Sequence, residues 1–269
     1  MKRFVVAVLV MAAITVASNA HAHFQLVYTP EQVVLKNGLM PFKLIFWHPF
    51  ENGHAMDMAK PESFFVVHKG QRTDLMGSLK PIIFHGAENK ANAFELSVPV
   101  NENGDYVFVL TPVPYWEDSE TQYIHQITKV IINKGGLPTD WEKPVGGLPT
   151  EIVPLTNPYT IPTGSTFTGQ VLTEGKPAPG IKIEVEYMAA EPDLKDNKPG
   201  KAKASPMPGG TIIVTTDANG VFTFGVPKAG WWGFSAIESG PVKELKGKKV
   251  EQDAVMWVQA HDLLGAEQK

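Results

Sequence analysis

The sequence contains no cysteine. This excludes disulfide bonds, thiolate metal ligands and thiol nucleophiles, so the fold has to be stabilised by packed cores. The sequence also has no block of basic residues, and its formal net charge is −4. A mildly acidic chain of this kind is a poor partner for nucleic acid, and we expect no such partner.

Long apolar runs are absent except at the N-terminus. Lys2 and Arg3 precede a thirteen-residue apolar stretch, residues 4–16, and small residues follow it. This order is typical of a secretory signal, and the stretch is too short to span a bilayer comfortably. We therefore expect cleavage of a signal at residues 1–22, which leaves a soluble exported protein and changes the formal charge from −4 to −6.

Two cleavage positions satisfy the rule of small residues at the cut. Cleavage after Ala22 makes His23 the first residue, whereas cleavage after Ala20 makes His21 the first residue. The motif Ala20-His21-Ala22 favours the first alternative, and both remain open.

The rest of the chain is dominated by short β-rich runs separated by turn residues, with no convincing amphipathic helix. Gly and Pro are frequent, at 24 and 22 residues, and punctuate these runs. The pattern predicts an all-β fold of immunoglobulin-like β-sandwich type. The predicted strands are 42–48, 63–69, 92–98, 105–111, 123–132, 166–173, 181–187, 211–216, 221–226, 231–237 and 254–260.

Composition divides these strands into two groups. Residues 134–162 are dense in Pro and Gly and contain GGLPT twice, which predicts a connector between an N-terminal domain, residues 23–133, and a C-terminal domain, residues 163–269. Within the second domain, residues 189–210 are polar and predict a mobile loop. The second domain resembles transthyretin-like and carboxypeptidase regulatory-like domains in its Gly-Lys-Pro turn and its Asp-x-x-Gly hairpin. Trp231 and Trp232 are expected in the core, and no residue of this domain suggests catalysis.

Histidine is the main indicator of a site, because seven of the eight histidines lie at or before His125. His48 ends a predicted strand and His54 follows in a loop that also contains acidic and methionine residues. Imidazole suits Zn, Cu, Ni and Co, so these two side chains can converge on one ion. The alternative is an exposed polar loop. Glu51, Met56, Asp57 and Met58 lie in the same segment, and whether they also coordinate the ion stays open.

The other histidines are weaker candidates. His125 lies in a predicted strand, where a hydrogen-bonded structural histidine is the simpler interpretation. His68 and His85 precede turns and are expected to be exposed.

Signal cleavage would itself create a ligand. With His23 first, its α-amine and imidazole chelate one metal ion through a single residue, because both groups lose a proton readily to a metal at neutral pH. With His21 first, the amine, two backbone amides and the His23 imidazole suit Cu(II) or Ni(II) in a square plane. Either cut therefore produces a nitrogen-rich chelate.

Five segments carry a resemblance to a known family: AHAHFQLVYTP, FWHPFENGHAMDMAKPESFFVV, YIHQITKVIIN, GLPTEIVPL and DANGVFTFGVPKAGWWGFSA. In them the chain resembles a bacterial periplasmic domain-of-unknown-function family whose members are described as nickel/cobalt-uptake accessory components of energy-coupling-factor-type transporters. The resemblance implies a periplasmic location, a membrane uptake transporter as partner, and a ligand set at His23, His48, His54 and His125.

The sequence thus predicts a non-enzymatic carrier that binds nickel or cobalt. Copper is the alternative metal, because Met56 and Met58 suit Cu(I). A metal-free structural module and a histidine-brace enzyme acting on polysaccharide are further alternatives; the latter needs a flat aromatic face, which the sequence does not reveal.

Overall fold

The computed structural model describes residues 24–205 and 212–263, and the signal segment and His23 lie outside these ranges. Within them the structure is all-β, as predicted, and the only helical element is the 3-10 turn Met76–Ser78. No helix in the described ranges has the length and apolarity needed to cross a membrane.

Each of the eleven predicted strands is a strand in the structure, with ends shifted by a few residues. They are β3 (Gly38–Trp47), β5 (Ser63–His68), β8 (Lys90–Val100), β9 (Gly104–Thr111), β11 (Gln122–Lys134), β14 (Thr166–Thr173), β16 (Lys182–Tyr187), β19 (Ile212–Thr215), β20 (Val221–Gly225), β21 (Gly230–Ala236) and β23 (Lys248–His261).

Further strands were not expected. The longer ones are β1 (Phe24–Tyr28), β7 (Lys80–His85) and β12 (Thr150–Pro154). The shorter ones are β2 (Val33–Val34), β4 (Ala55–Met56), β6 (Gln71–Asp74), β10 (Tyr115–Glu117), β13 (Ile161–Pro162), β15 (Lys176–Pro177), β17 (Pro192–Asp193), β18 (Lys198–Pro199) and β22 (Glu244–Leu245). β12 and β13 belong to the expected connector, which therefore contributes strands to the fold.

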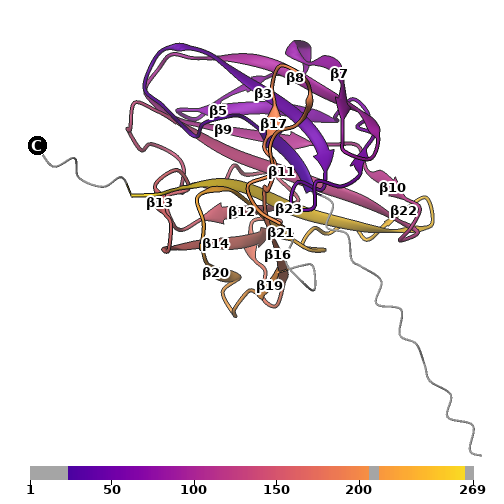
Figure 1. Cartoon of the computed structure of the whole chain (residues 1–269). Helices are drawn as coiled ribbons and strands as arrows, with labels where there is room; N and C mark the ends of the chain where they lie inside the picture. The colour runs from indigo at the N-terminus through magenta and orange to yellow at the C-terminus, as the bar shows by residue number, and fades with distance from the viewer. Residues whose placement is uncertain (1–23, 206–211, 264–269) are drawn as a thin grey trace, which may run out of the picture.

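Three sheets are stacked as layers (Figure 1). The central sheet has the strand order β19-β16-β21-β23-β11-β9-β5-β6. One face packs against the sheet β1-β3-β8-β7, and the other packs against a sheet formed by β12, β14, β15 and β20. The molecule therefore contains two β-sandwiches that share their middle layer.

Alternation along the central strands supplies both cores. On β11, Val130 belongs to the core on the β3 side, called the first core, and Ile127 belongs to the core on the β14 side, called the second core. Trp231 and Trp232 of β21 are divided in the same way and are only 1% and 3% exposed, as expected for core residues. Burial on both faces explains why β11 is almost continuously buried.

A parallel pairing joins the N-terminal half, residues 24–133, to the C-terminal half, residues 163–263. It runs between β11 and β23, from Tyr123 opposite Val250 to Val130 opposite Trp257. In Figure 1, β23 crosses the centre of the molecule beside β11.

The segment predicted as a mobile loop, residues 189–210, contains a hairpin in its described part, and residues 206–210 lie outside the described residues. Its first part forms the β17–β18 hairpin, which lies over the β3 side of the molecule (Figure 1). Asn197 accepts a hydrogen bond from Lys43 through its side chain and one of 2.7 Å from the His85 backbone through its carbonyl. Leu194 packs against the first core. These contacts compensate for the polar composition from which mobility was inferred.

Candidate metal-binding site

The histidine-containing loop follows β3 directly and is closed by hydrogen bonds. The backbone N–H of Gly53 donates to the His48 carbonyl at 3.2 Å, and Trp47 Nε1 donates to the Gly53 carbonyl at 3.1 Å. Asn52 has a φ of 54°, a left-handed conformation that asparagine adopts more readily than most residues. The sequence HPFENGH therefore forms a defined turn that places both histidines on one side of the fold.

His48 and His54 line the same pocket, which has a volume of about 390 Å³. No lysine or arginine lines this pocket, whereas four carboxylates do, so its electrostatics favour a cation. The lining residues are His48, Glu51, Gly53, His54, Glu88, Tyr115, Glu117, Asp118 and Ser119.

The carboxylates on the β10 side are oriented by local hydrogen bonds. Glu117 is 9% exposed and accepts hydrogen bonds from the backbone N–H and the hydroxyl of Ser119, at 2.9 and 2.6 Å. Asp118 accepts one from Trp116 Nε1 at 2.6 Å. These acids therefore face the pocket from a fixed turn.

The two histidines differ in exposure. His48 is buried, at 5% exposure, whereas His54 is exposed. His54 Nε2 lies 3.4 Å from Asn89 Nδ2, and Asn89 also holds Ala55, accepting from its N–H at 2.9 Å and donating to its carbonyl at 2.7 Å. Asn89 thereby orients the end of the loop that carries His54.

His125 does not line this pocket. It belongs to the opposite face of β11 from Ile124 and Gln126, and its Nδ1 lies 3.1 Å from Gln252 Nε2 on β23. Burial lowers the pKa of His125, and the nearby Glu62 offsets part of this effect. This is the environment of a hydrogen-bonded core histidine.

Within residues 24–205 and 212–263, no group of three or more His, Asp and Glu side chains is arranged to hold a metal ion. The last described pair between β1 and β3 is Phe24 opposite Trp47, and His48 follows Trp47. His23, the fourth predicted ligand, lies outside the described residues.

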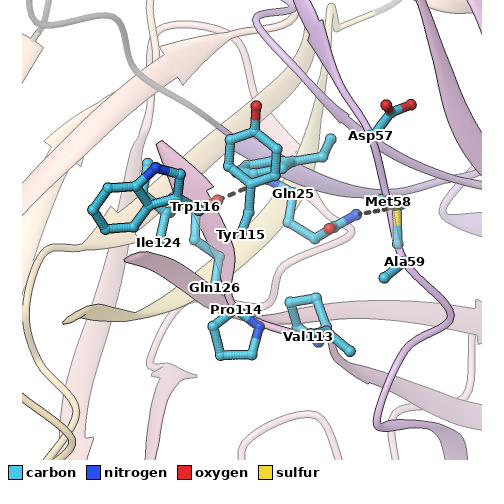
Figure 2. A pocket seen from close by; sticks show the side chains of 12 residues that line it. Gln25, Asp57, Met58, Ala59, Val113, Pro114, Tyr115, Trp116, Ile124 and Gln126 are labelled. Atoms are coloured by element: carbon cyan, nitrogen blue, oxygen red, sulfur yellow. Dashed lines mark hydrogen bonds between the residues drawn. The ribbon is translucent and has the colours of Figure 1, made fainter. Parts of the chain in front are cut away.

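A second pocket, of about 140 Å³, adjoins the first through Tyr115 (Figure 2). Gln25 Nε2 donates to Met58 Sδ at 3.3 Å inside it, and the Gln25 backbone N–H donates to Gln126 Oε1 at 2.7 Å. Met58 is 6% exposed and Met56 is 1% exposed, and both belong to the first core.

The acidic residues of this region also affect the pKa of Tyr115. Burial, together with Glu117, Asp57 and Asp118, raises its pKa. The sequence reasoning missed the contribution of residues 115–119 to the site. The available signal was the acidic run beside two aromatic residues, YWEDSE.

Comparison with known proteins gives one family match. The model of the family described as Domain of unknown function (DUF4198) matches residues 20–240. No match was found among curated proteins.

Solved structures are similar to this chain only at low identity and low TM-score. The D0-D1 domain of intimin is 14% identical over 86% of this chain and 96% of its own, with a TM-score of 0.21. The two tandem V-type regions of VCBP3, a v-region-containing chitin binding protein, are 10% identical over 86% and 98%, with a TM-score of 0.23. The fibronectin(III)-like modules of Clostridium thermocellum CbhA are 7% identical over 91% and 100%, with a TM-score of 0.19. Likeness at this level carries no functional information.

Proposed function

The chain belongs to the family described as Domain of unknown function (DUF4198), and from its own residues we propose that it binds a divalent transition-metal ion, nickel or cobalt, and delivers it to a membrane uptake transporter. The proposed ligands are the α-amine and imidazole of His23 together with His48 and His54. The protein would act in the periplasm after removal of residues 1–22.

The observation that carries this proposal is the shared pocket of His48 and His54. Its two imidazoles and four carboxylates favour a cation, but no three of its described His, Asp and Glu side chains are arranged to hold a metal ion alone. His48 immediately follows the strand that pairs with Phe24, the residue bonded to His23. A nitrogen donor at residue 23 is therefore the simplest completion of the site.

The donor type favours the class of ion, and the choice of nickel or cobalt within that class rests on the family resemblance. Imidazole and amine nitrogens suit borderline metals such as Ni²⁺ and Co²⁺, and poorly suit Mg²⁺ and Ca²⁺, which prefer oxygen. Transport as the purpose of binding rests on the resemblance to nickel/cobalt-uptake accessory proteins. His125 has no direct role in this proposal, because it does not line the pocket of His48 and His54 and its Nδ1 contacts Gln252.

The test uses protein purified with its native N-terminus, whose cleavage site is verified by intact mass. Calorimetric titration with Ni²⁺ should show one site per chain. A matched protein with one additional N-terminal alanine keeps every imidazole but converts the amine into an amide, so its affinity should fall by at least about 100-fold. Equal affinity of the two proteins would exclude the N-terminal chelate.

Copper binding is a second candidate, favoured by the thioether of Met58 in the adjoining pocket. Thioether ligands select Cu(I), and Cu(II) outcompetes Ni(II) at most nitrogen sites. Competition titrations at fixed free metal concentrations, together with growth under nickel or copper limitation, separate the two functions.

A further inference from the structure

Glu186 is a buried acid that contacts the histidine loop from the C-terminal half. It lies in β16, is 3% exposed, and its Oε1 accepts a hydrogen bond of 2.7 Å from the backbone N–H of Phe50. Phe50 is two residues from His48 and adjacent to Glu51. The contact therefore joins β16 of the central sheet to the proposed metal loop.

Tyr187 and Ala189, which follow Glu186 in the chain, contact the loop residues Phe50 and Pro49. The backbone N–H of Ala189 donates to the Pro49 carbonyl at 3.1 Å. The rings of Tyr187 and Phe50 meet edge to face, with centroids 6.5 Å apart and an interplanar angle of 89°. Pro49 and Phe50 are the only residues between His48 and Glu51, so the segment that separates these two pocket residues is fixed by the C-terminal half.

The chemistry of Glu186 argues against a role as a charge. Its Oε2 has no hydrogen-bond partner among the described residues, and the ionisable groups that act on it, Glu184 and Glu51, are also acids. Burial, reinforced by these two neighbours, raises the pKa of Glu186 well above its ordinary value. A neutral side chain that keeps one acceptor for the Phe50 N–H is consistent with this environment.

We propose that Glu186 is a positioning residue for the metal site, holding the His48–His54 loop in its binding geometry through the Phe50 N–H. This inference rests on the proposed metal-binding function and extends it by making the C-terminal half part of the site's construction. Residues that orient metal ligands typically alter affinity by about 10-fold to 100-fold when they are replaced.

The test compares two neutral replacements in the processed protein. Glu186→Gln retains a carbonyl acceptor and should bind Ni²⁺ within about twofold of the wild type. Glu186→Met has similar length but no comparable acceptor, and its affinity should fall by about 10-fold or more. The visible spectrum of bound Co²⁺, which reports ligand geometry, should change only in Glu186→Met.

A control separates positioning from general loss of stability. Val185→Ala lies on the same strand, and Val185 is buried in the second core, so this variant should lose about 1–3 kcal/mol of stability without changing Ni²⁺ affinity. Amide exchange at Phe50, measured by NMR without metal, should accelerate in Glu186→Met and not in Glu186→Gln.

The outcomes distinguish the two hypotheses. Accelerated exchange at Phe50 with unchanged metal affinity and spectrum in Glu186→Met would overturn the positioning role and leave metal binding intact. Absence of Ni²⁺, Co²⁺ and Cu²⁺ binding by the processed wild type would overturn both.

Discussion

Lys129 and Glu151 form an ion pair of 3.0 Å between two layers of the molecule, with side chains only 3% and 6% exposed. Lys129 belongs to β11 in the central sheet, and Glu151 belongs to β12 in the sheet that covers its second face. Burial lowers the pKa of Lys129, and Glu151 offsets part of that effect. The pair therefore anchors the strand formed by the expected connector.

Removal of the cation alone should be strongly destabilising. Lys129→Met leaves the Glu151 carboxylate buried without its partner, and we expect a loss of about 3–5 kcal/mol in urea unfolding. The double variant Lys129→Met, Glu151→Leu should recover most of this loss, since it removes both charges. The control is Lys143→Ala, which breaks a pair with Asp140 in which the lysine is 62% exposed and should cost less than about 1 kcal/mol. Similar losses from both single replacements would contradict this account.

The buried acid Glu186 should make stability fall as pH rises. Its pKa is raised in the folded protein above the ordinary value of 4.5, so the folded state retains a proton that the unfolded state releases. This contribution to stability is fully present below pH 4.5 and is lost as the pH rises through the folded pKa. Glu186→Gln removes the titration. The difference in unfolding free energy, variant minus wild type, should therefore increase between pH 4 and pH 8, and a flat difference would show that Glu186 is ionised in the fold.

The two buried histidines should respond differently to substitution. His48→Gln removes a proposed ligand from the shared pocket and should reduce bound nickel from about one ion per chain to near zero at micromolar metal. His125→Gln should retain full nickel stoichiometry and lose about 1–2 kcal/mol of stability, because it disturbs the contact with Gln252. Metal analysis after gel filtration measures the first effect and urea unfolding the second. Loss of nickel in His125→Gln would return that residue to the ligand set.

The β17–β18 hairpin should depend on the side chain of Asn197. This residue has a φ of 51°, so glycine keeps the backbone conformation while removing the amide that contacts Lys43. We expect Asn197→Gly to lose about 1–2 kcal/mol and to be cleaved faster in residues 192–199 during limited proteolysis. Lys198→Ala, which removes an exposed pair with Asp196, is the matched control and should be cleaved at the wild-type rate.

The strands that could be predicted are those whose alternation or turn residues are visible locally. β20, for example, follows an Asp-x-x-Gly turn, and the alternation of β11 places Ile127 and Val130 in opposite cores. β1 is uniformly buried and shows no such period, because the central sheet covers it as well as its own partner strand. β12 was not predicted, because the proline and glycine residues on both sides of it indicated a connector.

The candidate site was predictable only in part, because local sequence patterns do not specify contacts between distant segments. The spacing of His48 and His54 within one loop predicts their common pocket. The acids at residues 117 and 118 and the contact of Glu186 with Phe50 join segments separated by more than sixty residues, and no local pattern specifies such pairs. For His125, the strand pattern indicated a structural histidine and only the family resemblance indicated a ligand; the structure buries it beside Gln252, away from the pocket of His48 and His54.

The parallel pairing of β11 with β23 has a consequence for the order of assembly. Tyr123 pairs with Val250, which is 127 residues later in the chain. The central sheet is therefore complete only after β23, residues 248–261, has paired with β11 and β21. Until then, the edges of β11 and β21 that receive β23 are unpaired and both cores remain open. Non-local pairing of this kind slows folding, and a chain stopped before residue 248 would stay loose and sensitive to proteases. The complete fold therefore depends on β23, the last described strand of the chain.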